Sequence, residues 1–121
     1  MSIEVLAVDD SRTMRDMIRL ALEPAGFTVH TADDGVHGVE VLAGLTPDVI
    51  ITDINMPRMD GFGFIDAVRG QESHRATPIL VLTTESGADL KMRARNAGAT
   101  GWIVKPFDPA KLIQALNKVA G

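Results

Sequence analysis

Short apolar runs alternate with longer stretches of helical spacing along the whole chain, and this alternation restricts the fold more than any other feature. Short apolar runs predict strands, and apolar residues that recur every three or four positions predict helices. The predicted strands are residues 3–8, 27–31, 49–52, 79–82 and 101–104. Such alternation is typical of α/β folds, in which helices connect parallel strands by right-handed crossovers.

The stretch after the first run shows the helical spacing most clearly. Its apolar residues recur at i, i+3, i+4, i+7 and i+8, which predicts one helix face packed in the core. This face consists of Met14, Met17, Ile18, Ala21 and Leu22. Proline or glycine ends each of the first four predicted helices, and Asp108 before Pro109 predicts the start of a fifth.

Five strand–helix units predict a three-layer α/β fold with five helices and a five-stranded parallel sheet, for which 2-1-3-4-5 is a common order. The third, fourth and fifth runs contain continuously apolar stretches, so we expect helices to cover both of their faces. These stretches are residues 49–51, 79–82 and 102–104. The second run contains Thr28, His30 and Thr31, which is typical of an edge strand. At 121 residues, we expect one domain, residues 1–121, that stands alone without an output domain.

The composition disfavours several classes of protein. Twelve Lys and Arg against sixteen Asp and Glu give a net charge of −4, which disfavours binding to nucleic acid. The chain has no cysteine, so it forms no disulfide and no zinc–sulfur or iron–sulfur site. It shows neither a signal peptide nor an apolar run that approaches the roughly 20 residues needed to span a bilayer. We therefore expect a cytoplasmic protein.

Ionic or hydroxyl residues follow four of the predicted strands. Asp9 and Asp10 follow the first strand, Asp53 the third, Thr83 the fourth and Lys105 the fifth. Parallel strands end at one edge of a sheet, and ligands bind at that edge where the winding reverses, here between the first and third strands. We therefore expect three carboxylates, a hydroxyl and an ammonium to converge.

The charge of this cluster indicates a metal ion and a phosphoryl group. Crowded carboxylates repel one another, and Lys105 balances only one of the three. A hard divalent cation would balance the remainder, and Mg²⁺ suits one or two carboxylates with several waters retained. Mg²⁺ bridges to phosphoryl oxygens, and a carboxylate can attack a phosphoryl group to form an aspartyl phosphate. The sequence therefore predicts phosphoryl transfer to a carboxylate, with Thr83 and Lys105 as donors to the phosphoryl oxygens.

Other polar residues have simpler interpretations. We expect Asp33 and Asp34 to act as cap or turn residues after the second strand. The histidines show no metal-ligand spacing, and we expect each of them at the surface or at an edge. They are His30, His37 and His74.

Four segments of the chain carry motifs of a known family. They are Val8-Asp9-Asp10-Ser11, residues 48–57 leading to Met59-Asp60-Gly61, Leu82-Thr83-Thr84, and Lys105-Pro106-Phe107. Over its whole length, the chain resembles the receiver domains of response regulators, and most of all the single-domain chemotaxis regulators. The resemblance implies a flavodoxin-like fold and a role in two-component signalling.

The resemblance implies a role for each acidic residue of the cluster. Asp53 would be the phosphoacceptor, which receives the group from a phosphohistidine on a CheA-like sensor histidine kinase. Asp10, Asp53 and the backbone carbonyl of Asn55 would bind Mg²⁺ directly, and Asp9 would act through a metal-bound water. The chain would then gain and lose its own phosphoryl group, and it would not be an enzyme with a separate turnover substrate.

The resemblance also implies roles for residues around the phosphoacceptor. Thr83 matches the switch hydroxyl, and Lys105 matches the ammonium that pairs with the phosphoryl group. The Lys105–Pro106 bond corresponds to a cis peptide in the family. Asn55 and Glu85 match the positions that tune the rate of phosphate loss.

Trp102 departs from the family pattern, in which this position usually carries Tyr or Phe. By the resemblance, its side chain would follow Thr83 between two rotamers, although an indole is larger than a phenol and offers only an N–H donor. The emission of Trp102 would then report occupancy of the metal and phosphoryl sites. A simpler interpretation, a core or rim residue of the fifth strand, stays open.

In chemotaxis relatives, phosphorylation changes the affinity of a surface for the flagellar switch protein FliM. We expect this chain to be a monomer. We expect phosphorylation to change the surface formed by its fourth helix, fifth strand and fifth helix. Its basic side chains suit an acidic, partly helical partner segment. They are Lys91, Arg93, Arg95, Lys111 and Lys118.

Other functions stay open. A phosphate sink or a phosphorelay intermediate would share every site residue. A Mg²⁺-dependent phosphatase with an aspartate nucleophile needs a second carboxylate two positions later, where this chain has Asn55. A flavin or nucleotide carrier needs a phosphate-binding loop after the first strand, where Asp9 and Asp10 repel anions.

Overall fold

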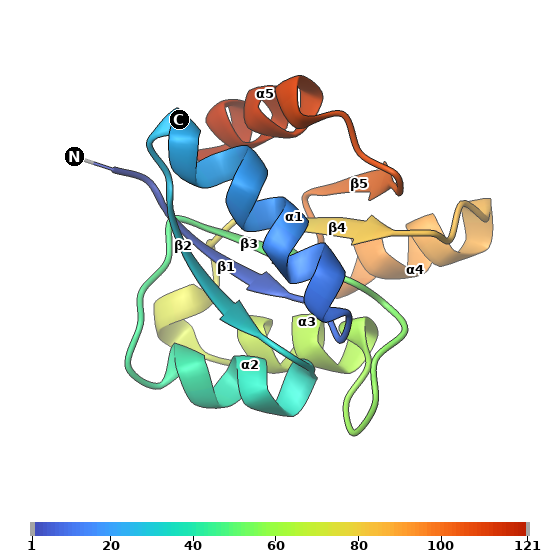
Figure 1. The fold of residues 1–121 in the computed structure, drawn as a ribbon. Helices are drawn as coiled ribbons and strands as arrows, with labels where there is room; N and C mark the ends of the chain where they lie inside the picture. The colour runs from blue at the N-terminus through green and yellow to red at the C-terminus, as the bar shows by residue number, and fades with distance from the viewer. Residues whose placement is uncertain (1, 121) are drawn as a thin grey trace.

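The computed structural model describes residues 2–120, and its centre is a parallel sheet (Figure 1). Five strands pair in the order β2-β1-β3-β4-β5, which confirms the predicted order. Each strand begins and ends within one residue of its predicted bounds. The strands are β1 (Glu4–Val8), β2 (Thr28–Ala32), β3 (Val49–Thr52), β4 (Ile79–Thr83) and β5 (Gly101–Val104).

Helices cover both faces of the sheet (Figure 1). On one face lie α1 (Arg12–Leu22) and α5 (Pro109–Ala120). On the other face lie α2 (Gly35–Leu42), α3 (Gly61–Arg69) and α4 (Ala88–Ala97). Short 3-10 turns, Glu23–Ala25 and Glu72–His74, follow α1 and α3. Each helix within residues 2–120 is too short or too polar to cross a membrane.

Alternate strand residues build a separate apolar core on each face of the sheet, because successive side chains of a strand point to opposite sides. Leu6 and Ile50 pack toward α2 and α3, whereas Val5 and Ile51 pack toward α1 and α5. Every residue of β3 and β4 is buried. Burial on both faces explains why these two strands are apolar up to the threonine that ends each of them.

β5 is less buried than β3 and β4, because it is an edge strand with a neighbour on one side only. Its first three residues are half-buried and Val104 is 39% exposed, although Trp102 and Ile103 pack against the cores on opposite faces.

Two predictions about burial are wrong. Met17 is 41% exposed, because Ile18 and Leu22 form the face of α1 that packs on the sheet. His74 is only 3% exposed, because the 3-10 turn that ends with it folds its side chain into the protein.

The first residue of α3 is held very close to the end of β3. A Cβ atom at Gly61 would lie 2.2 Å from the carbonyl oxygen of Asp53 and 2.8 Å from the Cα atom of Ile54. The Gly61 N–H also donates to the Ile54 carbonyl at 2.8 Å. This close approach of two backbones requires glycine, and it fixes the start of α3 against the chain that follows β3.

We expect Gly61→Ala to lower the free energy of unfolding by roughly 1–3 kcal/mol, because the added methyl group must push backbone atoms apart. Urea denaturation followed by circular dichroism measures this change. Gly44→Ala is the matched control, since nothing lies within 4 Å of a Cβ atom at that position. The control should change the stability by less than about 0.5 kcal/mol. Equal effects of the two substitutions would contradict the close approach.

Candidate functional site

The carboxyl ends of β1 and β3 lie side by side, and an aspartate follows each of them. Val8 pairs with Thr52, so Asp9 and Asp53 are the next residues on two adjacent strands. The Asp53 N–H donates to the Val8 carbonyl at 2.9 Å, which extends the pairing to the aspartate itself. Both side chains therefore lie at the point where the winding of the sheet reverses.

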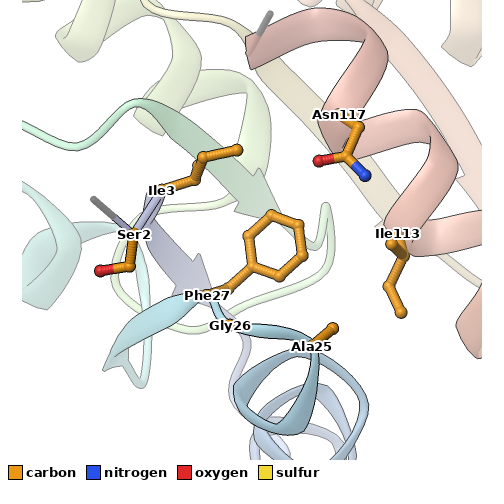
Figure 2. Close-up of a pocket in the computed structure, with 7 residues that line it drawn as sticks. All are labelled: Ser2, Ile3, Ala25, Gly26, Phe27, Ile113 and Asn117. Atoms are coloured by element: carbon orange, nitrogen blue, oxygen red, sulfur yellow. The ribbon is translucent and has the colours of Figure 1, made fainter.

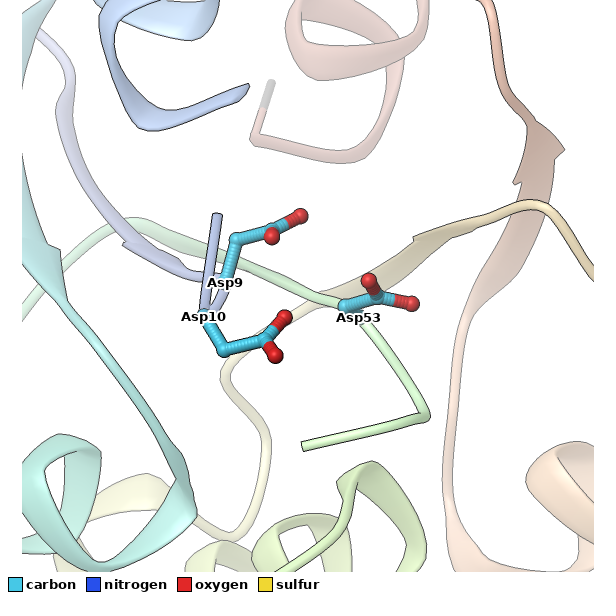
Figure 3. Close-up of side chains that lie close together, drawn as sticks. All are labelled: Asp9, Asp10 and Asp53. Atoms are coloured by element: carbon cyan, nitrogen blue, oxygen red, sulfur yellow. The ribbon is translucent and has the colours of Figure 1, made fainter. Parts of the chain in front are cut away.

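Asp9, Asp10 and Asp53 form a cluster of carboxylates at this edge (Figure 3). One carboxylate oxygen of each residue lies within 4.8 Å of the others. Asp9 is 2% exposed and Asp53 is 8% exposed, whereas Asp10 is exposed to solvent. The structure thus brings together the three carboxylates that the sequence predicts to converge, with Asp10 on the solvent side.

Lys105 reaches the cluster from the end of β5. Its N–H donates to the Thr83 carbonyl at 2.8 Å, which continues the pairing of β5 with β4. Its Nζ donates to Asp9 Oδ2 and to Asp53 Oδ2, in both cases at 2.8 Å. The Lys105–Pro106 peptide bond is cis, the form that the resemblance implies. One ammonium, on a side chain that is 10% exposed, is therefore shared by two carboxylates.

Burial changes the proton affinity of the groups in this cluster. Burial raises the pKa of the Asp9 carboxyl, and the hydrogen bonds from Lys105 and from the Ser11 N–H only partly oppose this rise. Burial also acts to lower the pKa of Lys105, but its hydrogen bonds to Asp53 and Asp9 outweigh this effect and the pKa is raised. Lys105 therefore stays charged, and the excess of negative charge favours a further cation.

The donor set fits a hard divalent cation. The ligand atoms available in the cluster are carboxylate oxygens, which Mg²⁺ prefers, and the solvent side leaves space for the waters that this ion retains. Within residues 2–120, no other group of three or more Asp, Glu, His or Cys side chains has this spacing. The chain therefore has a single candidate metal centre among its described residues.

Glu85 contacts three other residues that the sequence predicts for the site. Asn55 Nδ2 donates to Glu85 Oε1 at 3.0 Å, which joins the chain after β3 to the chain after β4. The indole Nε1 of Trp102 donates to the Glu85 carbonyl at 2.9 Å. The Glu85 N–H approaches Oγ1 of the fully buried Thr83 at 3.4 Å. These contacts connect Thr83 and Trp102 through one segment, and their switching roles stay predictions.

The sequence did not predict two arginines that hold the surroundings of the site. Asp34 caps α2 as expected, but it also forms an ion pair with Arg58, whose Nε and Nη2 donate to its two carboxylate oxygens at 2.6 and 3.0 Å. Arg15 Nη1 donates to the Asp9 carbonyl at 2.7 Å. Both contacts depend on loop conformations, which the periodicity of the sequence does not specify. The only signal for the contact of Arg58 with Asp34 was the pair of aspartates, Asp33 and Asp34, that follows the second strand.

A cavity of about 300 Å³ lies near the amino ends of β1 and β2 (Figure 2), whereas Asp9, Asp10 and Asp53 follow the carboxyl ends of their strands. Phe27, Ile113 and Asn117 line it together with residues at the start of β1 and after α1. None of its lining side chains is ionisable. It therefore contributes nothing to the charge chemistry described above.

The sequence matches the response regulator receiver domain over residues 5–117. This chain belongs to the receiver domain family. Among curated relatives, the chemotaxis protein CheY of Pseudomonas aeruginosa is 37% identical over 118 residues, which cover 97% of this chain and 95% of the relative. CheY-3 of Vibrio cholerae is 35% identical over 119 residues, which cover 98% of this chain and 92% of the relative.

Solved receiver domains share the fold over nearly the whole chain. CheY4 of Vibrio cholerae superposes with a TM-score of 0.94 at 46% identity, covering 98% of this chain and 99% of that one. The receiver domain of the sensor histidine kinase PA1611 of Pseudomonas aeruginosa has a TM-score of 0.92 at 28% identity, covering 100% of this chain and 99% of that one. That structure has a magnesium ion coordinated in its active site cleft. The family resemblance and the strand order expected from the sequence are confirmed.

The raised pKa of Lys105 predicts a loss of stability at alkaline pH. Below the ordinary lysine pKa of about 10.4, Lys105 is protonated in the folded and unfolded states, and its ion pairs contribute fully to stability. Above that pH the unfolded state releases the proton first. The free energy of unfolding therefore falls until the pH passes the raised pKa of the folded state.

Lys105→Met should lack this part of the alkaline decline, and chemical denaturation at a series of pH values measures it. The chain has no tyrosine and no cysteine that would titrate in the same range. The exposed Lys111 supplies the control, because Lys111→Met should keep the wild-type profile. Parallel profiles for the wild type and Lys105→Met would show that the ion pairs do not stabilise the folded state.

Proposed function

We propose that this receiver domain is a phosphorylation-driven signalling switch in which Asp53 accepts a phosphoryl group. The proposed donor is the phosphohistidine of a CheA-like sensor histidine kinase. The observation that supports Asp53 is its position: it follows β3, the central strand, between β1, which Asp9 follows, and β4, which ends at Thr83. Its Oδ2 also accepts a hydrogen bond from Lys105 at 2.8 Å, and such a cation can stabilise charge on a phosphoryl group.

In the proposed reaction, an Asp53 oxygen attacks phosphorus while the bond from phosphorus to the imidazole nitrogen breaks. The released imidazole takes up a proton. Asp10, Asp53 and the backbone carbonyl of Asn55 would hold Mg²⁺, which supplies positive charge to the phosphoryl oxygens when bound. The charged Lys105 side chain is 10% exposed and contacts Asp53, so its Nζ can move to a phosphoryl oxygen while Thr83 offers its hydroxyl from β4.

Incubation with acetyl phosphate and Mg²⁺ should add one phosphoryl group to the chain, and intact-mass spectrometry measures this gain. Chelation of the metal or the substitution Asp53→Asn should reduce the product to background. Trp102 is the only tryptophan, so its emission in the same samples should change with Mg²⁺ and with the donor. Phosphorylation of Asp53→Asn at the wild-type rate would overturn the assignment of the phosphoacceptor.

Phosphorylation is proposed to act by changing the surface formed by α4, β5 and α5. Trp102 in β5 donates to the Glu85 carbonyl, and the Glu85 N–H approaches the Thr83 hydroxyl. A movement of the Thr83 hydroxyl would therefore reach this surface through Glu85 and Trp102. Lys91 and Met92 of α4 are exposed there. A basic and apolar surface suits an acidic amphipathic segment. We propose the flagellar switch protein FliM as its source, on the ground of the resemblance to chemotaxis regulators. We propose that the chain acts as a cytoplasmic monomer without a separate turnover substrate.

A labelled peptide from FliM should bind the phosphorylated chain about 10-fold more tightly than the unphosphorylated chain, as fluorescence anisotropy measures. Asp53→Asn should bind with the lower affinity under both conditions. Lys91→Ala should weaken binding without preventing phosphorylation, because the lysine lies on the proposed surface and outside the acidic cluster. Affinity that is independent of phosphorylation would instead favour a phosphate sink or a phosphorelay intermediate.

A further inference from the structure

The loop between β3 and α3, residues 53–60, carries both the proposed phosphoacceptor and Asn55. One hydrogen bond ties the start of the loop to the sheet, and another closes its end. Asp53 donates its N–H to Val8 at 2.9 Å, and Gly61 donates its N–H to Ile54 at 2.8 Å. Asn55 lies between these bonds and is exposed, and a further contact holds the part of the loop that follows it.

That contact is an ion pair between Arg58 and Asp34, the residue that caps α2. The two hydrogen bonds measure 2.6 and 3.0 Å, and the Asp34 side chain is only 6% exposed. The same carboxylate accepts the His37 N–H at 2.8 Å. Arg58 therefore joins the loop after β3 to the nearly buried carboxylate that caps α2. The hydrogen bonds from Arg58 are the main cause that lowers the pKa of Asp34.

The backbone at Arg58 has an uncommon conformation. Arg58 has a φ of 63°, and it is the only non-glycine residue with positive φ within residues 2–120. The Met59 N–H donates back to the Pro57 carbonyl at 2.6 Å, so Arg58 is at the centre of a three-residue turn. A non-glycine residue keeps such a conformation only where its surroundings enforce it.

A second hydrogen bond joins the same two segments. The Gly35 N–H donates to the Met59 carbonyl at 3.2 Å, and a Cβ atom at Gly35 would lie 2.6 Å from that oxygen. Arg58 and Met59 therefore form adjoining contacts with the first turn of α2. The loop is closed against α2 on one side and against the end of β3 on the other.

We propose that Arg58 is a positioning residue for the metal centre, because its ion pair with Asp34 holds the loop that presents Asn55 to the bound cation. This inference rests on the proposed function, in which the Asn55 carbonyl is a metal ligand. Neither Arg58 nor Asp34 contributes an atom to the acidic cluster. Residues that orient metal ligands typically change metal affinity by about 10-fold or more when they are removed.

Mg²⁺ titration of the full chain tests this role, with binding measured by calorimetry and by Trp102 emission. Arg58→Ala and Asp34→Asn should each weaken Mg²⁺ binding roughly 10-fold. Asparagine is a good N-cap, so Asp34→Asn keeps the start of α2 while it removes the ion pair. The double substitution should be no weaker than either single one, because both remove the same interaction.

Simple electrostatics predicts a different pattern. Loss of the positive charge of Arg58 would strengthen the binding of a cation, whereas loss of the negative charge of Asp34 would weaken it. The positioning role predicts that both substitutions weaken binding. Arg75→Ala, at an exposed arginine before β4, is the control for net charge and should bind Mg²⁺ as the wild type does.

Two further measurements separate positioning from a general loss of structure or from relief of backbone strain. Arg58→Gly adopts positive φ freely, so it should bind Mg²⁺ as weakly as Arg58→Ala if the ion pair is responsible. Without metal, hydrogen exchange of the Gly35 amide should become faster in Arg58→Ala, while the Gly61 amide should keep its protection.

The possible failures can be told apart. A wild-type chain that binds no Mg²⁺ would overturn the metal centre and this inference together. Wild-type affinity in Arg58→Ala, Asp34→Asn or Arg58→Gly would overturn the positioning role alone. Opposite effects of Arg58→Ala and Asp34→Asn would assign the contribution of Arg58 to charge and would likewise overturn the positioning role.

Discussion

The ammonium of Lys105, shared between two buried carboxylates, is the interaction on which the arrangement of the site depends. Asp9 and Asp53 end neighbouring strands, and without a cation between them their charges would oppose the pairing that brings them together. A lysine can supply this cation from β5 because its long apolar stem is compatible with burial while its Nζ reaches both carboxylates. One positive charge leaves the cluster of three carboxylates negative overall, and this excess of negative charge favours a metal ion at the site.

The order of the strands turns local sequence into this geometry. Because β1 and β3 are adjacent although their sequences are far apart, residues 9 and 53 meet without any special loop. Thr83 and Lys105 follow from the register of β4 and β5 in the same way. The three-layer fold therefore places each chemical group by pairing of strands, and the loops only adjust how the groups are presented.

Periodicity was enough to predict the five strands and five helices, and the common 2-1-3-4-5 order of such folds then predicted the convergence of Asp9, Asp10 and Asp53. The strands and helices follow from alternation, which a sequence records directly, whereas the strand order came from the fold class. The burial of His74 and the exposure of Met17 were missed because they depend on how a short turn and a helix are rotated against their neighbours. The ion pair of Arg58 with Asp34 was missed because it joins two loops at a positive φ, which neither propensity nor spacing indicates.

The two loops beside the site are held with different strength, and this difference indicates where a response can travel. The loop after β3 is fixed by backbone contacts at Gly35 and Gly61 that leave no space for a methyl group. The segment after β4 leads into α4, which begins at Gly87 without a side-chain cap and buries only Ala94 fully. Elements with few buried contacts open at lower free energy than those fixed in the core. The segment between Thr83 and α4 is therefore less constrained than the loop after β3, which agrees with the proposal that a response passes toward α4 and Trp102.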